Sequence, residues 1–277
     1  WRATSFSQLT YHQDHDDRPL GAIDENHLLD LPLAESQETL DAYTFPKGAK
    51  AGSCLHEIFE LIDFSEPETP QAPNLTLEEA VKQTLDKFGF EDKWQAPVKH
   101  WVLACLTCKL DSNLALKDIT PSQRLVEMEF NLPLAPLDQV TLNNIVSNIT
   151  QHPSNLKFDN VKGLLKGFID LIFEHQGKYY ILDYKSNYLG DTPSDYASDN
   201  LVQAMNAHQY HLQYMIYTVA LHRLLKARLP SYQPEQHLGG VYYVFLRAMG
   251  DGEGVFFKQL SLSELEQLDA LFLQGAV

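Results

Sequence analysis

The 277-residue sequence lacks the features that mark membrane and secreted proteins. No apolar run approaches the roughly 20 residues that a membrane-spanning helix needs, and no signal peptide is visible at the start. Cysteine is scarce, and the three cysteines are an odd number, unlike a disulfide framework. We therefore expect a soluble, globular, cytoplasmic protein that has no contact with a membrane.

Two of the cysteines, Cys105 and Cys108, form a C-x-x-C pair in an apolar, helix-like segment. A zinc site would need further ligands at suitable spacing, and His100 is the one candidate nearby. Buried free thiols, including Cys54, are the better interpretation.

Basic residues are few: 21 Lys and Arg stand against 37 Asp and Glu, for a formal net charge of −16. This balance argues against a generic basic nucleic-acid binder, because contacts to phosphates require Lys and Arg. An acidic chain that handles nucleic acid must receive it from a partner, or hold it locally through metal ions and a few positive groups.

The first fifty residues differ in character from the rest of the chain. They begin without Met, and they include an acidic, His-bearing run at residues 12–17 in which a solvated charge cluster is a better interpretation than a metal site. Thr4 or Ser5 could cap a short helix. We expect a linker-like segment over 1–50 and a folded domain over 51–277, cut from a longer protein; 44% hydrophobic residues suffice for its core.

The stretch from Gly163 to Asn187 contains two short apolar runs joined by Gln176-Gly177. Strand propensity is high in both runs, so the stretch predicts a β-hairpin. If Gln176 and Gly177 are the two central turn residues, the ladder sets Asp170 opposite Asp183. A three-residue turn would shift Asp170 by one position unless a bulge restored the pairing.

Two carboxylates roughly 5 Å apart in an apolar hairpin repel each other, and a divalent cation is the natural compensation. Lys185 shares a strand face with Asp183, because the side-chain period of a strand is two. Oxygen ligands suit Mg²⁺ or Mn²⁺ better than zinc, and a neighbouring lysine can position or help to deprotonate a water. The combination of Asp170, Asp183 and Lys185 indicates phosphodiester hydrolysis.

Other segments complete an alternating pattern of helices and strands. Helical periodicity begins at Gly52 and carries His56, which in isolation is more often structural than a ligand. A second helix has Thr76 as its N-cap and Gly89 as its stop. Residues 122–132 predict a strand with Glu127 and Glu129 on one face, which usually means an exposed face.

The segment from about residue 200 to 229 predicts one long helix. Gln209, Gln213 and Tyr217 follow one another at i, i+4 spacing, so they form a polar stripe. A further strand near residue 241, a shorter one after it, and a final helix capped by Ser261 or Ser263 follow. The fold class we predict is α/β, with a central mixed β-sheet flanked by helices.

The hairpin motif at Asp170, Asp183, Tyr184 and Lys185 resembles the PD-(D/E)xK nuclease motif, and GFID…LDYKSN resembles the RecB-type branch of that superfamily. Three more segments resemble motifs of this branch: FPKGAKAGSCLHEIFE, VEMEF and HLQYMIYTVALHRLL. The classical Pro before the first Asp is absent, as it commonly is in RecB-type members. The resemblance covers most of the chain and implies a restriction-endonuclease-like fold.

The resemblance also implies roles for particular residues. Asp170, Asp183, Lys185 and Glu127 would be catalytic, with Glu127 favoured over Glu129. The metal would be Mg²⁺, with Mn²⁺ as a substitute and Ca²⁺ non-productive, and Gln213 and Tyr217 would brace the site or touch DNA. The metal ligands would be His56, Glu127, Asp170, Asp183 and the backbone carbonyl of Tyr184.

Partners follow from the same resemblance. Single-stranded or unwound DNA would be delivered by a helicase part of the same chain and by RecC- and RecD-like subunits, which suits the acidic charge. A contact with the recombinase RecA is a further expectation. The alternative is a non-catalytic docking module on a nuclease-like fold, and the complete set of motif residues speaks against it.

Overall fold

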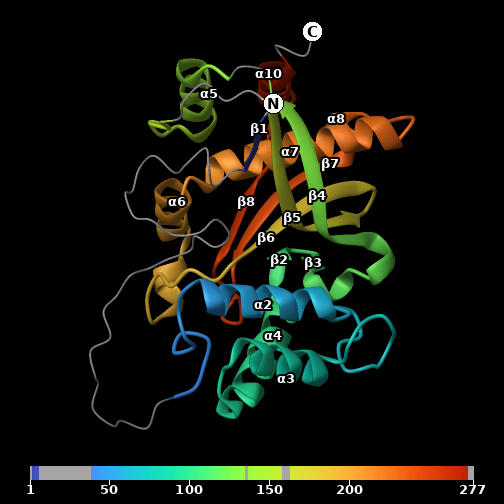
Figure 1. The fold of residues 1–277 in the computed structure, drawn as a ribbon, viewed down its shortest axis with the longest axis vertical. Helices are drawn as coiled ribbons and strands as arrows, with labels where there is room; N and C mark the ends of the chain where they lie inside the picture. Colours follow the sequence, from blue (N-terminus) through green and yellow to red (C-terminus); the bar gives the residue numbers. More distant parts are fainter. Residues whose placement is uncertain (1, 6–38, 135–136, 158–162, 274–277) are drawn as a thin grey trace.

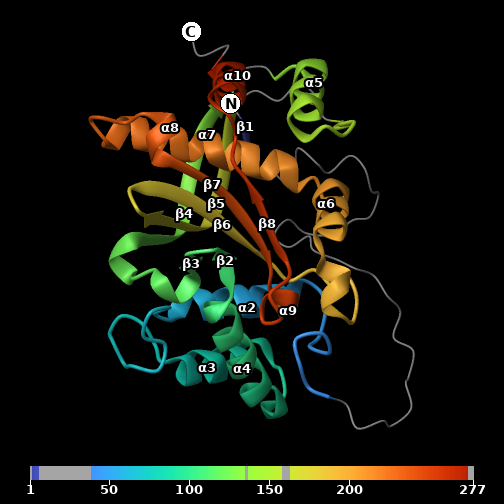
Figure 2. The same ribbon diagram turned by 180° about the vertical axis from the view of Figure 1, so that it is seen from behind.

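A six-stranded mixed sheet runs through the molecule, with helices packed against both of its faces (Figures 1 and 2). The computed structural model describes residues 2–5, 39–134, 137–157 and 163–273. The α/β architecture with a central mixed sheet is therefore confirmed. Its strands are β1 (Arg2–Ser5), β4 (Arg124–Leu134), β5 (Gly163–His175), β6 (Lys178–Lys185), β7 (Leu238–Phe245) and β8 (Val255–Lys258), in the order β1-β5-β6-β7-β8 with β4 also paired to β5.

The helices form two groups, one on each side of this sheet (Figures 1 and 2). One group is α2 (Ala49–Leu61), α3 (Leu77–Phe88) and α4 (Gln95–Thr107), followed by the small pair β2 (Lys109–Asp111) and β3 (Leu114–Ala115). The other contains α5 (Gln139–Thr150), α6 (Ser198–Ala207), α7 (Tyr210–Arg228) and α10 (Leu262–Leu273), while the short α8 (Pro234–His237) and α9 (Leu246–Met249) flank β7. No helix in the described ranges has the length and apolarity that a membrane crossing requires.

Helix ends follow the predicted caps. The Thr76 hydroxyl accepts from the Glu79 amide at 3.3 Å, and the Glu79 carboxylate accepts from the Thr76 amide at 3.0 Å, while Gly89 ends α3 with φ 64°. Ser261, rather than Ser263, caps α10. Local sequence therefore fixes these boundaries.

The hairpin predicted at Gln176-Gly177 is confirmed. His175 pairs with Lys178, so the turn has two central residues. Both of these have positive φ, 53° for Gln176 and 80° for Gly177, as in a type I′ turn, whose twist matches that of the strands.

The sheet forks along one edge of β5. β4 pairs along the opposite edge from Gly163 to Phe173, so β1 and β6 must share the remaining edge. β1 takes residues 163–166 and β6 takes residues 171–175. Beyond the Leu171–Leu182 pair, β6 leaves β5 and continues along β7. Continuing the hairpin register by one residue places Asp170 across from Asp183 at the fork.

Two hydrophobic cores lie on the two faces of the sheet. The first packs against α5, α6, α7 and α10, and the second packs against α2, α3 and α4. On β6, Ile181 faces the first core, while Leu182 and Tyr184 face the second. Asp183 and Lys185 share the parity of Ile181, so they lie on the side of α7.

Two helices replace the one predicted over residues 200–229, so that prediction is wrong. α6 ends at Ala207, and Gln209 adopts φ 56° before α7 begins. His208 Nε2 lies 3.3 Å from Asn187 Nδ2, and the Tyr210 hydroxyl donates to Asn187 Oδ1 at 3.1 Å. Contacts to the segment after β6 thus outweigh the local helical periodicity, and they take Gln209 off the predicted polar stripe.

Parts of the first fifty residues belong to the folded body. Thr4 and Ser5 lie in β1, so the prediction that one of them caps a helix is wrong. Phe45 is fully buried in the second core. The division at residue 50 stays a prediction, and residues 6–38, with the His-bearing run, lie outside the described residues.

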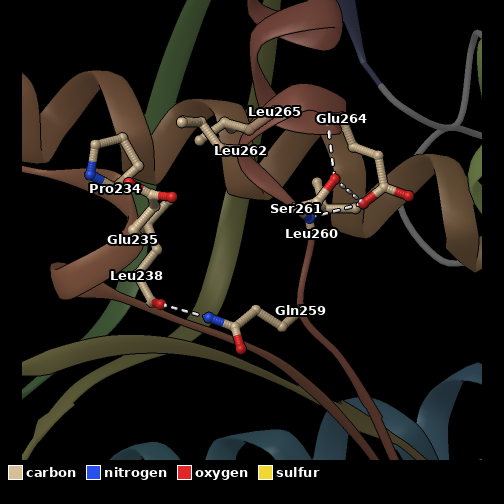
Figure 3. Close-up of a pocket in the computed structure, with 9 residues that line it drawn as sticks. All are labelled: Pro234, Glu235, Leu238, Gln259, Leu260, Ser261, Leu262, Glu264 and Leu265. Carbon is tan, nitrogen blue, oxygen red and sulfur yellow. Dashed lines mark hydrogen bonds between the residues drawn. The ribbon is translucent and has the colours of Figure 1, made fainter.

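A pocket of about 420 Å³ opens between α8, the start of β7 and the start of α10 (Figure 3). Four of its lining residues are hydrogen-bonded in pairs: Ser261 donates to Glu264 at 2.8 Å, and Gln259 donates to the Leu238 carbonyl at 2.9 Å. It lies at the opposite end of β7 from the fork, and none of the predicted site residues lines it.

Candidate active site

The fork changes the direction of the side chains on β5. Ile169 packs in the first core and Leu171 in the second, although a regular strand would keep both on one face. The switch falls at Asp170. Glu127 of β4 occupies the same rung, between the pairs Val126–Leu171 and Met128–Ile169, and it has φ 50°, a conformation that L-residues rarely adopt. The backbones of β4 and β5 are therefore both irregular at the position where Glu127 lies across from Asp170.

His56 reaches the fork from α2. Its Nε2 donates to the Tyr184 carbonyl at 2.9 Å, and its Nδ1 lies 3.5 Å from Asp170 Oδ2. The same Asp170 oxygen accepts from the Tyr184 amide at 2.9 Å. Stacking of the Tyr184 ring on Phe59 of α2, at 4.7 Å, holds the helix against β6. The structure therefore brings together three predicted metal ligands: His56, Asp170 and the Tyr184 carbonyl.

Asp183 lies on the other side of the fork and is 2% exposed. Lys185 Nζ is 2.7 Å from Asp183 Oδ2, so the buried carboxylate is ion-paired with the ammonium. Burial raises the pKa of the Asp183 carboxyl well above its usual range, and the Lys185 charge opposes this rise. Asp183 is thus a buried acid whose charge is balanced by the Lys185 ammonium.

Lys185 is enclosed by side chains from α7 and β7. Its ammonium donates to Gln213 Oε1 at 3.3 Å and lies 3.9 Å from the centre of the Tyr210 ring and 5.3 Å from that of Tyr243. Gln213 also accepts from the Tyr243 hydroxyl and donates to the Tyr217 hydroxyl, both at 2.9 Å. Gln213 and Tyr217, both predicted site residues, therefore hold the lysine in place.

Glu127 and Glu129 have different surroundings. Glu129 is bound to Lys166 at 3.1 Å and to Asn131 at 3.1 Å, away from the fork. Within the described ranges, Glu127 makes no hydrogen bond or ion pair with the other predicted residues, but it lies within electrostatic range of Asp170. Burial of the carboxyl, together with the Asp170 charge, raises the pKa of Glu127 to about 7.

The donor set suits a hard divalent cation, because it offers carboxylate and carbonyl oxygens with one imidazole. Asp183 Oδ2 already contacts one cation, the ammonium of Lys185, so this buried oxygen lies in surroundings that suit positive charge. No three His, Cys, Asp or Glu side chains among the described residues stand close enough to form a ready-made metal site. The ion pair of Asp183 with Lys185 and the bond of Asp170 to the Tyr184 amide hold the two carboxylates apart.

Sequence reasoning missed several residues that shape the site. Glu60 lies one turn after His56 on α2, and burial raises its pKa, as does the Asp170 charge. Its i+4 spacing from His56 was a usable signal. Tyr210 begins α7 three residues before Gln213, and the local helical periodicity gives no sign of the break that places it there. Tyr243 pairs with Asp183 in the parallel ladder, and local sequence gives no sign of that pairing.

Arg247 is also missing from the predicted set, and it is 1% exposed. Its guanidinium donates to the carbonyls of Ala42, Phe45 and Pro46, at 2.6, 3.0 and 2.9 Å, and to that of Ser186 at 3.1 Å. These bonds tie the segment before α2 to the residue after Lys185. Arg247 thereby joins the elements that carry His56 and Lys185.

Comparison with known proteins agrees with this arrangement. A family model described as the PD-(D/E)XK nuclease superfamily matches residues 29–276. The chain is 35% identical to the RecBCD enzyme subunit RecB of Escherichia coli K12, over 98% of this chain and 23% of that protein. The RecB subunits of Haemophilus influenzae and Mycobacterium tuberculosis are 31% and 30% identical, over 98% and 90% of this chain and 24% and 26% of those proteins. The chain spans about a quarter of the length of these relatives.

Proposed function

Because the chain belongs to the PD-(D/E)XK nuclease superfamily, we propose that it is a metal-dependent nuclease that hydrolyses phosphodiester bonds in DNA. The observation that carries the proposal is the fork, where Lys185 pairs with Asp183 at 2.7 Å and His56 lies 3.5 Å from Asp170. The RecB relatives support a place in a RecBCD-type helicase–nuclease of double-strand break repair and recombination, with exonuclease V activity.

The ligands we propose for the metal are His56, Glu127, Asp170, Asp183 and the Tyr184 carbonyl. Mg²⁺ is the expected ion, Mn²⁺ would substitute for it, and Ca²⁺ would bind without turnover. When bound, the ion supplies positive charge that stabilises the charge developing on the phosphoryl oxygen. The His56 ring nitrogen that now donates to the Tyr184 carbonyl would have to give up its proton to ligate.

Lys185 acts on the attacking water. Its ammonium is already held by Asp183, Gln213 and the Tyr210 ring, so little side-chain freedom remains to be lost when the water is positioned. Tyr217 fixes the Gln213 amide from its far side. The side chains of Lys185, Gln213 and Tyr217 thus orient the attacking water.

Partners extend the proposal beyond this chain. In the relatives, RecB is a subunit of the RecBCD enzyme. We propose that a helicase part and RecC- and RecD-like subunits deliver unwound single strands, since a net charge of −16 opposes independent capture of DNA. A RecA contact belongs to the same proposal.

Cleavage of single-stranded DNA by the purified chain, with and without Mg²⁺, tests the function. Asp183→Ala and Lys185→Ala are expected to abolish cleavage, at least about 100-fold, while circular dichroism shows folded protein. Glu127→Gln should also lose activity, whereas the matched control Glu129→Gln should stay within about twofold because Glu129 points away from the fork. Full cleavage by folded Asp183→Ala and Lys185→Ala variants would contradict the fork as the active site, whereas a folded wild type that cleaves no DNA would leave the docking-module interpretation.

A further inference from the structure

Among the residues that the structure describes, the ribbon formed by β4 and β5 is covered on one face only. β4 lies in front of α7 in Figure 1, and α7 lies in front of β4 in Figure 2. On the covered face, Leu165 and Ile169 are buried and the Phe130 ring fills the space beside Gly167. Lys166 and Phe168 occupy the opposite face and are exposed.

Phe168 lies on this open face two residues before Asp170. Phe168 is 44% exposed. A polar residue would suit this exposed strand position next to Lys166 equally well, so packing does not require an aromatic ring there. The one ring contact recorded for it among the described residues is Lys166 Nζ, 5.5 Å from the ring centre, and that ammonium also pairs with Glu129 at 3.1 Å. No aromatic side chain among the described residues stacks on Phe168, so one face of the ring is open to a ligand.

Phe257 provides a contrast at the other edge of the sheet. It is 46% exposed, close to the value for Phe168, but its ring packs on Tyr242 at 4.7 Å and covers the space beside Gly240. Packing within the sheet therefore explains why an aromatic residue stands at position 257. No comparable packing among the described residues explains the aromatic residue at position 168.

Geometry relates Phe168 to the carboxylates. Residues two apart on a strand are separated by roughly 6.6 Å. The side-chain direction of β5 changes at Asp170, but His56 contacts Asp170 from α2, which packs on the same side of the sheet as the open face that carries Phe168. A planar group on Phe168 would therefore lie about one nucleotide away from a phosphate held beside Asp170. Aromatic side chains next to a positive group are the platforms on which proteins stack the bases of single strands.

We propose that Phe168 stacks on an unpaired base of the DNA substrate, next to the phosphodiester that is cleaved, with Lys166 beside it to meet the backbone. The inference rests on the nuclease function proposed above and specifies its substrate: a strand whose base faces are free. A base inside a duplex has both faces covered by its neighbours, so stacking on Phe168 favours single-stranded over double-stranded DNA.

The binding experiment uses fluorescence and needs no turnover. Phe168→Trp keeps an aromatic platform and adds a probe, which is titrated with oligo(dT) in EDTA at low salt. Its emission should be quenched saturably, and that of Phe257→Trp should not change. No quenching of Phe168→Trp overturns the inference and leaves a protein segment as the alternative occupant of this face.

The kinetic experiment separates the inference from the nuclease proposal. Phe168→Ala should raise KM for a single-stranded substrate about 5- to 150-fold, Phe168→Tyr should restore it, and Phe257→Ala should match the wild type. If the wild-type chain itself does not cleave DNA, the nuclease proposal fails. If the wild type cleaves and folded Phe168→Ala has an unchanged KM, the stacking inference alone is wrong.

Discussion

Lys185 shows how a single buried cation can be held in position for chemistry. The Asp183 carboxylate, the Gln213 amide oxygen and the Tyr210 ring face all contact its ammonium, so its position is determined by several groups. The sequence predicts the first two partners from strand periodicity and motif resemblance. It could not predict the ring, because that contact depends on the break between α6 and α7.

Glu127 carries a prediction about pH. Its pKa is raised to about 7, so the folded chain binds more protons than the unfolded chain between roughly pH 4.5 and pH 7. Ionised Glu127 therefore lowers the free energy of unfolding most above pH 7. Glu127→Gln removes the charge and should stabilise the metal-free chain at pH 8 by up to about 1 kcal/mol, after allowance for screening by solvent.

Urea unfolding of both proteins in EDTA, at pH 4 and at pH 8, measures this difference. The stabilisation by Glu127→Gln should shrink toward zero at pH 4, where the Glu127 carboxyl is largely protonated in both the folded and the unfolded chain. Glu129→Gln, whose carboxylate is paired with Lys166, should show no such gain at pH 8. A Glu127→Gln gain that is equal at both pH values would contradict the assigned cause.

At the scale of elements, the fork in β5 makes the site. The sequence predicts the hairpin, its two-residue turn and the facing aspartates, because these depend on local strand propensity and turn chemistry. It does not predict that β1 and β6 share one edge of β5, since pairing between distant strands leaves no local pattern. Nor does it predict the left-handed backbone of Glu127.

Arg247 carries the prediction at this scale, since it joins the segment before α2 to the end of β6. Arg247→Lys would leave several buried carbonyls unpaired and should lower the free energy of unfolding by about 3 kcal/mol or more. Urea unfolding measures the loss. Arg223→Lys is the control: Arg223 pairs with Asp269 at 2.6 Å in a partly buried contact, so about 1 kcal/mol is expected. Equal losses in the two variants would contradict the joining role.

At the scale of the whole molecule, charge and architecture serve one purpose. A net charge of −16 opposes the approach of free DNA, and under the proposed function the fork would hold a cation beside one enclosed lysine. Composition alone predicts that such a chain needs help to hold nucleic acid. The partners proposed above rest on the relatives, of which this chain spans about a quarter.

The central claim is that a divalent cation binds at the fork between Asp170 and Asp183. Crystals of the chain soaked with Mn²⁺ test it directly, by anomalous diffraction at pH 8, where the raised pKa of Asp183 least opposes binding. We predict one peak in contact with both carboxylates, absent from Asp183→Ala crystals. A fork without a peak at saturating Mn²⁺, in crystals whose protein still cleaves DNA, would contradict the account.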